Sequence, residues 1–280
     1  MEIILAEPIG YCYGVERALN IVKKALISES GNIYTLGPII HNPQVVEKLE
    51  KSGIKTIENF ENVNIGTLII RAHGNDPKKI ERARKMGFKV IDATCPFVKM
   101  NQKIASQLIK EGYFLLVIGE KEHPEILGIL ASADGPSIVI ENKNDFKILP
   151  DAEKVGVISQ TTQSMENFTS VVSYLLKKHK EIKIFNTICD ETIERQKSAK
   201  NIANKVDLML IIGGKNSANT KRLAVIGKSI NENTYHIETS EEIIEKWLKG
   251  VKKVGISGGA STPKWLIDEA FKKIKKITSH

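Results

Sequence analysis

Three cysteines, Cys12, Cys95 and Cys189, each stand between a short apolar run and a segment with helical periodicity. The helix dipole favours a thiolate at such a place, and thiolates are the usual ligands of iron–sulfur clusters. Structural zinc sites typically use a local C-x-x-C pair, which this chain lacks. The cysteines therefore favour a cluster with three protein ligands and one open iron, with zinc or simple burial of the thiols as alternatives.

Histidine, serine and asparagine side chains follow other apolar runs. In a parallel α/β sheet, ligands gather at the carboxyl ends of the strands, which is where these side chains are expected. Such donors suit a compact anion with several charges, for example a diphosphate. The candidate ligands are His41, His73, His123, Ser217, Asn219 and Ser261. The remaining histidines are interpreted as ordinary structural residues: His179, His236 and His280.

One carboxylate near these loops is placed to act as an acid. Glu125 follows His123 by two residues in KEHPE. Beside a cluster and an anion its pKa should rise, which would keep it protonated and able to deliver a proton. Thr161 and Thr162 in SQTTQS could orient or relay that proton. The alternative is structural, with Glu125 complementing a helix dipole and the threonines capping the next helix.

A cysteine followed by two polar loops recurs three times along the chain, at similar spacing. The offsets are 29 residues from Cys12 to His41, 28 from Cys95 to His123 and 28 from Cys189 to Ser217. A later loop of each set carries His73, Thr161 or Ser261. Because the loops of all three sets share this order, we interpret them as an internal repeat.

Short apolar runs alternate with helical patterns throughout, which predicts βα units and parallel sheets. We expect an α/β fold of three similar small domains with four strands each, over residues 1–95, 96–188 and 189–280, with the N-terminal strand free to pair with the third domain. If the domains face one another around a pseudo-threefold axis, as in a trefoil, the strand ends and the cysteines meet in one central cavity.

The 280-residue chain carries 41 Lys and Arg against 33 Asp and Glu, a net charge of +8. This balance suits an anionic substrate or an acidic protein partner. No cluster of arginines and aromatics indicates nucleic acid, and no apolar run approaches the roughly 20 residues of a membrane-spanning helix. The N-terminus does not resemble a signal peptide, and fingerprints of nucleotide-binding loops are absent. We therefore expect a cytoplasmic protein with neither a nucleic-acid nor a membrane partner.

Taken together, the motifs resemble those of the 4-hydroxy-3-methylbut-2-enyl diphosphate reductase family, which catalyses the last step of the methylerythritol phosphate route to isoprenoids. The resemblance covers nearly the whole chain. It rests on GYCYGVERA, GPIIHNPQVV, RAHG, DATCPFV, EHPE, SQTTQS, NTIC followed by RQ, GGKNSANTKRL and GGASTP.

The resemblance implies a trefoil of three α/β domains around one oxygen-sensitive 4Fe-4S cluster, which can appear as 3Fe-4S after oxidation. The three cysteines would hold it, leaving one iron open to the hydroxyl of an allylic diphosphate substrate. Two electrons, from ferredoxin or flavodoxin, and two protons would remove that hydroxyl as water. The products would be isopentenyl and dimethylallyl diphosphates.

The resemblance also implies residue roles. Glu125 would begin the proton path, with Thr161 and Thr192 near the substrate hydroxyl. The diphosphate would be held by His41, His73, His123, Ser217, Asn219 and Ser261. Two positions depart from the family pattern: Ala218 replaces a serine, which removes a hydroxyl donor, and Arg71 replaces a small residue. An electron carrier or redox sensor with the same cluster is the alternative from another class, and Glu125→Gln separates it from an enzyme.

Overall fold

The structure is a computed structural model that describes residues 1–149 and 151–278, so that His280 lies outside the described residues. The chain forms two compact units. The first contains Met1–Val15, His41–Glu47 and the chain from Asp190 onward, and the second contains Glu16–Ile40 and Lys48–Cys189. Within the described residues, no helix is long and apolar enough to span a bilayer.

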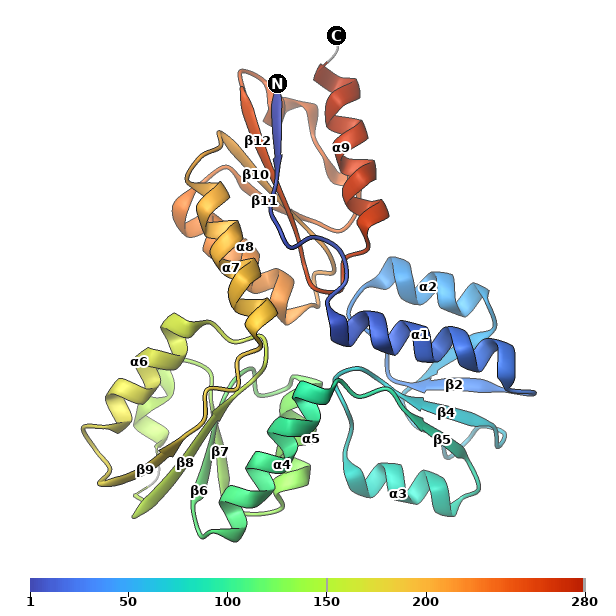
Figure 1. The fold of residues 1–280 in the computed structure, drawn as a ribbon, viewed down its shortest axis with the longest axis vertical. Coiled ribbons are helices and arrows are strands. Elements are labelled where there is room, and N and C mark those ends of the chain that lie inside the picture. Colours follow the sequence, from blue (N-terminus) through green and yellow to red (C-terminus); the bar gives the residue numbers. More distant parts are fainter. Residues whose placement is uncertain (150, 279–280) are drawn as a thin grey trace. The chain divides into compact units, whose positions relative to one another are not determined.

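Three four-stranded, entirely parallel sheets form the framework (Figure 1). Sheet A belongs to the first unit and has the order β1 (Glu2–Leu5), β12 (Lys253–Gly258), β10 (Leu208–Ile212), β11 (Thr234–Ile237). Sheet B has the order β3 (Ile54–Ile57), β2 (Ile33–Leu36), β4 (Thr67–Ile70), β5 (Lys89–Asp92). Sheet C has the order β7 (Ser137–Ile140), β6 (Phe114–Ile118), β8 (Lys154–Ser159), β9 (Glu181–Ile184). The predicted α/β class with four strands per sheet is confirmed.

Helices cover both faces of sheet A. The central strand β10 is apolar and buried along its whole length, as expected of a parallel strand that is covered on both faces. Alternate residues of β10 point to opposite faces: Leu208, Leu210 and Ile212 share a core with α9 (Lys264–Thr278), whereas Met209 and Ile211 pack with α7 (Asp190–Ala203) and α8 (Ala218–Ile230). Two short 3-10 helices lie between β11 and β12: η2 (Ser240–Glu242) and η3 (Glu245–Leu248).

The second unit repeats this layering. Helices α4 (Pro96–Lys110) and α5 (Pro124–Ala133) share a core with β6 of sheet C, and α6 (Met165–Leu175) connects β8 to β9. Sheet B packs one face on α3 (Pro77–Lys85). The remaining helices are α1 (Tyr13–Ser28), α2 (Pro43–Lys51) and the 3-10 helix η1 (Lys143–Ile148).

Each sheet has a point at which its connections diverge. In sheet C the chain leaves β6 toward β7 and leaves β8 toward β9, in opposite directions across the sheet. Sheet B does the same at β2 and β4, and in sheet A β10 and β12 hold the equivalent places. In open α/β sheets the loops at the carboxyl ends of these two central strands form the ligand site.

The edge strand of each sheet leads to a cysteine. We expected those strands to reach the cysteines, but β1, β5 and β9 end at Leu5, Asp92 and Ile184, which is seven, three and five residues earlier. The residues between each edge strand and its cysteine do not continue the strand, because their backbone polar groups have other hydrogen-bond partners. Asn186, for example, accepts a hydrogen bond from the amide of Ile188 (3.3 Å). Three loops therefore carry the thiols. The domain limits at residues 95 and 188 stay a prediction.

Candidate functional site

All three cysteines occupy the residue immediately before a helix: Cys12 before α1, Cys95 before α4 and Cys189 before α7. Their thiols are half-buried. Each cysteine amide donates to the carbonyl two residues beyond the end of a central strand. These distances are 3.0 Å from Cys12 to Ala260, 2.9 Å from Cys95 to Ala72 and 3.0 Å from Cys189 to Thr161. The backbone places every thiol at a helix N-terminus beside a switch-point loop.

The electrostatics of the second unit suit a bound cation. Burial raises the pKa of Cys95, and the charges of Cys189 and Glu125 raise it further, while the amides of Phe97 and Val98 oppose the rise. Two thiolates and a carboxylate that repel one another would be stabilised by a metal ion or cluster, which also keeps a thiol deprotonated. The donor set therefore fits a thiolate-bound metal group.

In the first unit the loops after β10 and β12 carry the predicted anion ligands. Ser217 caps α8, with its hydroxyl accepting a hydrogen bond from the amide of Thr220 (3.3 Å). The hydroxyl of Ser261 donates to the carbonyl of His41 (3.0 Å). Asn219 is buried, and neither its amide nitrogen nor its amide oxygen has a hydrogen-bond partner among the described residues. Because buried amides are nearly always paired, Asn219 indicates a polar ligand.

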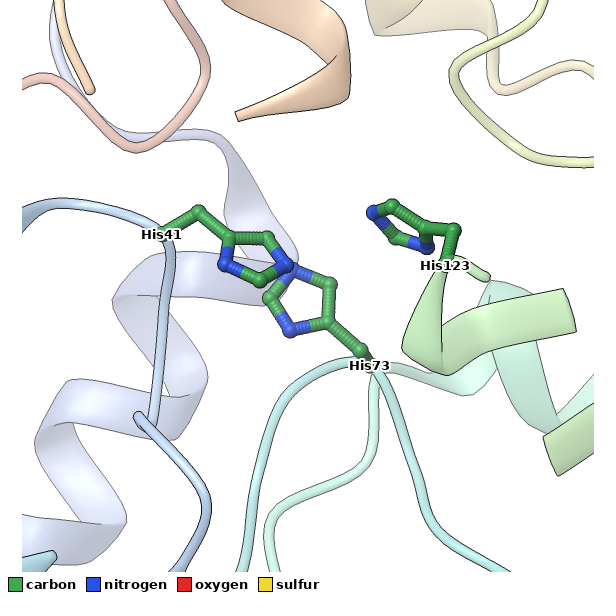
Figure 2. Close-up of side chains that lie close together, drawn as sticks. All are labelled: His41, His73 and His123. Carbon is green, nitrogen blue, oxygen red and sulfur yellow. The ribbon is translucent and has the colours of Figure 1, made fainter. Parts of the chain in front are cut away.

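In the second unit two histidines meet edge to face, with 5.5 Å between the ring centroids of His73 and His123 and 85° between their planes. Figure 2 draws the His73 and His123 side chains as sticks. His41, which is also labelled there, belongs to the first unit. The Nδ1 atom of His123 accepts a hydrogen bond from the amide of Glu125 (3.2 Å) and caps α5. A neutral ring in that role carries its hydrogen on Nε2, which is then a hydrogen-bond donor.

Glu125 is almost completely buried in the first turn of α5. One carboxylate oxygen accepts the amide of Thr161 and the other accepts its hydroxyl, both at 2.7 Å. Burial raises the pKa of Glu125 to about 7, although the two hydrogen bonds act to lower it. The carboxyl group is therefore poised to exchange a proton near neutral pH.

The two units divide the predicted residues between them. The first holds Cys12, His41, Thr192, Ser217, Asn219 and Ser261, and the second holds Cys95, Cys189, His73, His123, Glu125 and Thr161. Thr192 is buried in the first turn of α7. Of the two departures, Ala218 is the buried first residue of α8, and the half-buried Arg71 donates from Nε to the carbonyl of Gly74 (3.3 Å) within its own loop.

The structure shifts the register of the internal repeat. The carbonyls that accept from the cysteine amides belong to Ala72, Thr161 and Ala260. The residues one further along, which include His73 and Ser261, therefore match Thr162 in place of Thr161. The hydroxyl oxygen of Thr162 is buried without a partner among the described residues, which identifies it as a candidate contact with a ligand. Aligning the three repeats by the ends of their central strands would have matched Thr162 with His73 and Ser261. Aligning them by distance from the cysteines matched Thr161 instead.

Switch-point loops that present hydroxyl, imidazole and amide groups, together with thiols at three helix starts, are the features that characterise this α/β protein. The chain belongs to the LytB protein family, whose profile matches residues 3–275.

Proteins called 4-hydroxy-3-methylbut-2-enyl diphosphate reductase are close relatives. The one from Aquifex aeolicus is 49% identical over 280 residues, covering 99% of this chain and 97% of its own. The one from Geobacter sulfurreducens is 48% identical and covers 99% of this chain and 98% of its own.

Two solved structures are similar over nearly the whole chain. One is described as (E)-4-hydroxy-3-methyl-but-2-enyl diphosphate reductase, the terminal enzyme of the non-mevalonate pathway. It is 48% identical with a TM-score of 0.72 and covers 99% of this chain and 100% of its own. The other is the E-1-hydroxy-2-methyl-but-2-enyl-4-diphosphate reductase from Plasmodium falciparum, 33% identical with a TM-score of 0.92, covering 98% of this chain and 87% of its own.

Proposed function

We infer that this chain acts as a 4-hydroxy-3-methylbut-2-enyl diphosphate reductase in the non-mevalonate route to isoprenoids. Its relatives of this name match it from end to end. The reaction adds two electrons and two protons to the allylic alcohol, breaks its carbon–oxygen bond and releases the hydroxyl as water. The products are isopentenyl and dimethylallyl diphosphates.

We propose Cys12, Cys95 and Cys189 as the ligands of one 4Fe-4S cluster with one iron open. When bound, such a cluster supplies electron transfer and a Lewis-acid position for the substrate hydroxyl. The support is the chemistry of the donors. Each cysteine directly precedes a helix, and the charge of Cys189 raises the pKa of the Cys95 thiol. The hydrogen bonds from the cysteine amides to backbone carbonyls hold the backbone at all three cysteines in place.

The diphosphate would be bound by Ser217, Asn219 and Ser261 with His41, His73 and His123. The observation that carries this assignment is the buried, unpartnered amide of Asn219 at the start of α8. The helix N-terminus adds a favourable dipole for phosphate oxygens. Ala218 brings no hydroxyl, so its position can offer only a backbone contact.

Glu125 would deliver a proton through Thr161, with Thr192 near the hydroxyl of the substrate. Its pKa near 7 gives a mixture of protonated and ionised forms at neutral pH. The Thr161 hydroxyl oxygen lies 2.7 Å from a carboxylate oxygen of Glu125. When Glu125 is protonated, it can donate its proton to the Thr161 oxygen while the hydrogen of Thr161 passes to an oxygen on the other side. Protonation of Glu125 also removes a negative charge that raises the pKa of Cys95.

We further propose that ferredoxin or flavodoxin supplies the electrons. The net charge of +8 supports an acidic partner of this kind. A cytoplasmic location would suit three thiols that must stay reduced.

The test is anaerobic turnover of the allylic diphosphate with a reduced donor, with the cluster followed by its visible and Mössbauer spectra. Glu125→Gln should lower kcat by roughly 10²–10⁴ with the spectra unchanged, because it removes a general acid. Asn219→Leu should mainly raise KM. A Glu125→Gln protein that still turns over at the parent rate would refute the acid role, and a chain without visible absorption after cluster reconstitution would refute the function.

A further inference from the structure

A buried arginine holds the loop that carries Cys12. Arg195 lies on α7, six residues after Cys189, and is 1% exposed. Its Nη1 donates to the carbonyls of Pro8 (3.1 Å) and Gly258 (3.3 Å), and its Nη2 donates to the carbonyl of Gly10 (2.9 Å). These contacts join the cysteine loop to the end of β12 within the first unit.

A carboxylate completes this arrangement. Glu191, one turn earlier on α7, pairs with Nη2 of Arg195 at 2.6 Å. Its second oxygen accepts the amide of Tyr13 (3.4 Å), the residue after Cys12. The amide of Cys12 itself donates to Ala260. The backbone of residues 8–13 is therefore fixed on both sides of the thiol, by an arginine whose buried charge is balanced by Glu191 and three carbonyls.

The helix after Cys95 does the same for the loop of Cys189. Asn101, six residues after Cys95 and fully buried, donates from Nδ2 to the carbonyl of Ser159 (3.0 Å). The hydroxyl of Thr187 donates to that same carbonyl (2.7 Å) and accepts the amide of Ser159 (2.8 Å). Thr187 is two residues before Cys189, so Asn101 acts on the loop through the end of β8.

The helix after Cys12 completes the series with a weaker contact. At its sixth position stands Ala18, which cannot donate a hydrogen bond. Its neighbour Arg17 is half-buried and donates from Nη1 to the carbonyl of Thr94 (3.1 Å), the residue before Cys95. The order is cyclic: the helix of each cysteine acts on the loop of the next, by direct hydrogen bonds from Arg195 and Arg17 and, for Asn101, through Ser159.

We propose that Arg195, Asn101 and Arg17 are positioning residues that fix the three cysteine loops in this cyclic order, with Arg195 acting most strongly, on Cys12. The contacts join only groups of the chain itself, so we expect them to order the loops independently of a metal group and thereby to lower the cost of binding it. The proposal rests on the proposed function only for the identity of that group. Its test needs neither substrate nor turnover and therefore can succeed or fail independently.

The experiment labels the full-length, reduced, cluster-free chain with N-ethylmaleimide and measures the rate at each cysteine by mass spectrometry. Arg195→Met should speed labelling of Cys12 relative to Cys95 by about tenfold, because losing hydrogen bonds to a charged group shifts local opening by that order. Asn101→Leu should speed Cys189 relative to Cys12 by a smaller factor. Arg195→Lys, which keeps the charge, should lie between the parent and Arg195→Met.

Ile274→Ala and Ile129→Ala are the controls, because each removes buried side-chain volume from the core of one unit and neither side chain makes any of the hydrogen bonds described above. Any change in these controls should affect the labelling rates of all three cysteines by the same factor. In the cluster-loaded chain, Arg195→Met should also speed loss of iron to a chelator and broaden the Mössbauer spectrum. Equal acceleration at all three cysteines in Arg195→Met, or an unchanged Cys12 to Cys95 ratio, would overturn the proposal.

Discussion

Arg195 in the first unit and Glu125 in the second are both 1% exposed, but only Arg195 has an oppositely charged partner. Arg195 has a carboxylate at 2.6 Å and three backbone carbonyls. The two hydrogen bonds that Glu125 accepts both come from neutral groups of Thr161. A buried charge with a countercharge is a fixed structural element, whereas one stabilised only by dipoles has a shifted pKa and exchanges protons. The contrast separates a positioning role from a chemical one.

The largest effect should come from removing the arginine. Arg195→Met should lower the free energy of unfolding by about 3–5 kcal/mol, the usual consequence of breaking a buried ion pair from one side. Urea titration followed by circular dichroism measures it. Lys197→Met, at an exposed position on the same helix, is the matched control and should change stability little. If Arg195→Met lowers the free energy of unfolding no more than Lys197→Met does, Arg195 is not the fixed structural element that distinguishes it from Glu125.

Glu125 should instead give a pH-dependent effect. Its pKa is raised from 4.5 to about 7 on folding, so its contribution to stability is fully present below pH 4.5 and is lost as the pH rises through 7. The loss should be roughly 3 kcal/mol by linkage. Urea midpoints of Glu125→Gln should therefore fall less than those of the parent between pH 5 and pH 8. Parallel pH curves for the two proteins would show that Glu125 does not titrate there; Glu194→Gln, which is exposed, is the control.

The variant Asn101→Leu tests whether a neutral positioning contact contributes less to the free energy of unfolding than the charged contact of Arg195. Asn101→Leu should cost about 1–3 kcal/mol, since the Ser159 carbonyl keeps its bond from Thr187 and only the amide contact is lost. Thermal unfolding at one pH is sufficient to measure this. A cost equal to that of Arg195→Met would mean that the countercharge at Arg195 adds nothing.

The smallest change is expected at Arg17. Arg17→Met removes one hydrogen bond, to Thr94 at a half-buried site, and should cost less than about 1 kcal/mol. The measurement is again the urea midpoint, with Arg84→Met on the exposed side of α3 for comparison. A cost above that of Asn101→Leu would reverse the proposed ranking.

Much of the fold follows from local pattern. Strands such as β2, β4, β6 and β10 were predictable because each is short, apolar and followed by a helical pattern. The sequence also indicated that the cysteines start helices. It did not show where the strands end, because the residues before each cysteine satisfy their backbone groups through contacts with distant parts of the chain, such as the carbonyl of Gly10 with Arg195.

The positioning residues were the harder part of the site to predict. Arg195, Ala199 and Ile202 share one helix face, as do Asn101, Ala105 and Leu108. A polar side chain in such an apolar row is a signal of a buried hydrogen bond. The identity of its partners depends on sheet order, which helical spacing does not contain.

The pairing of β1 with β12 has a consequence for biosynthesis. Glu2 lies opposite Lys253, so the edge strand β1 of sheet A is synthesised long before its neighbour β12, a central strand of the same sheet. Sheets B and C contain only strands that lie between these two and can form while synthesis continues. Cys12 follows β1 and therefore reaches its final place only after β12 has been made, later than the strands of sheets B and C.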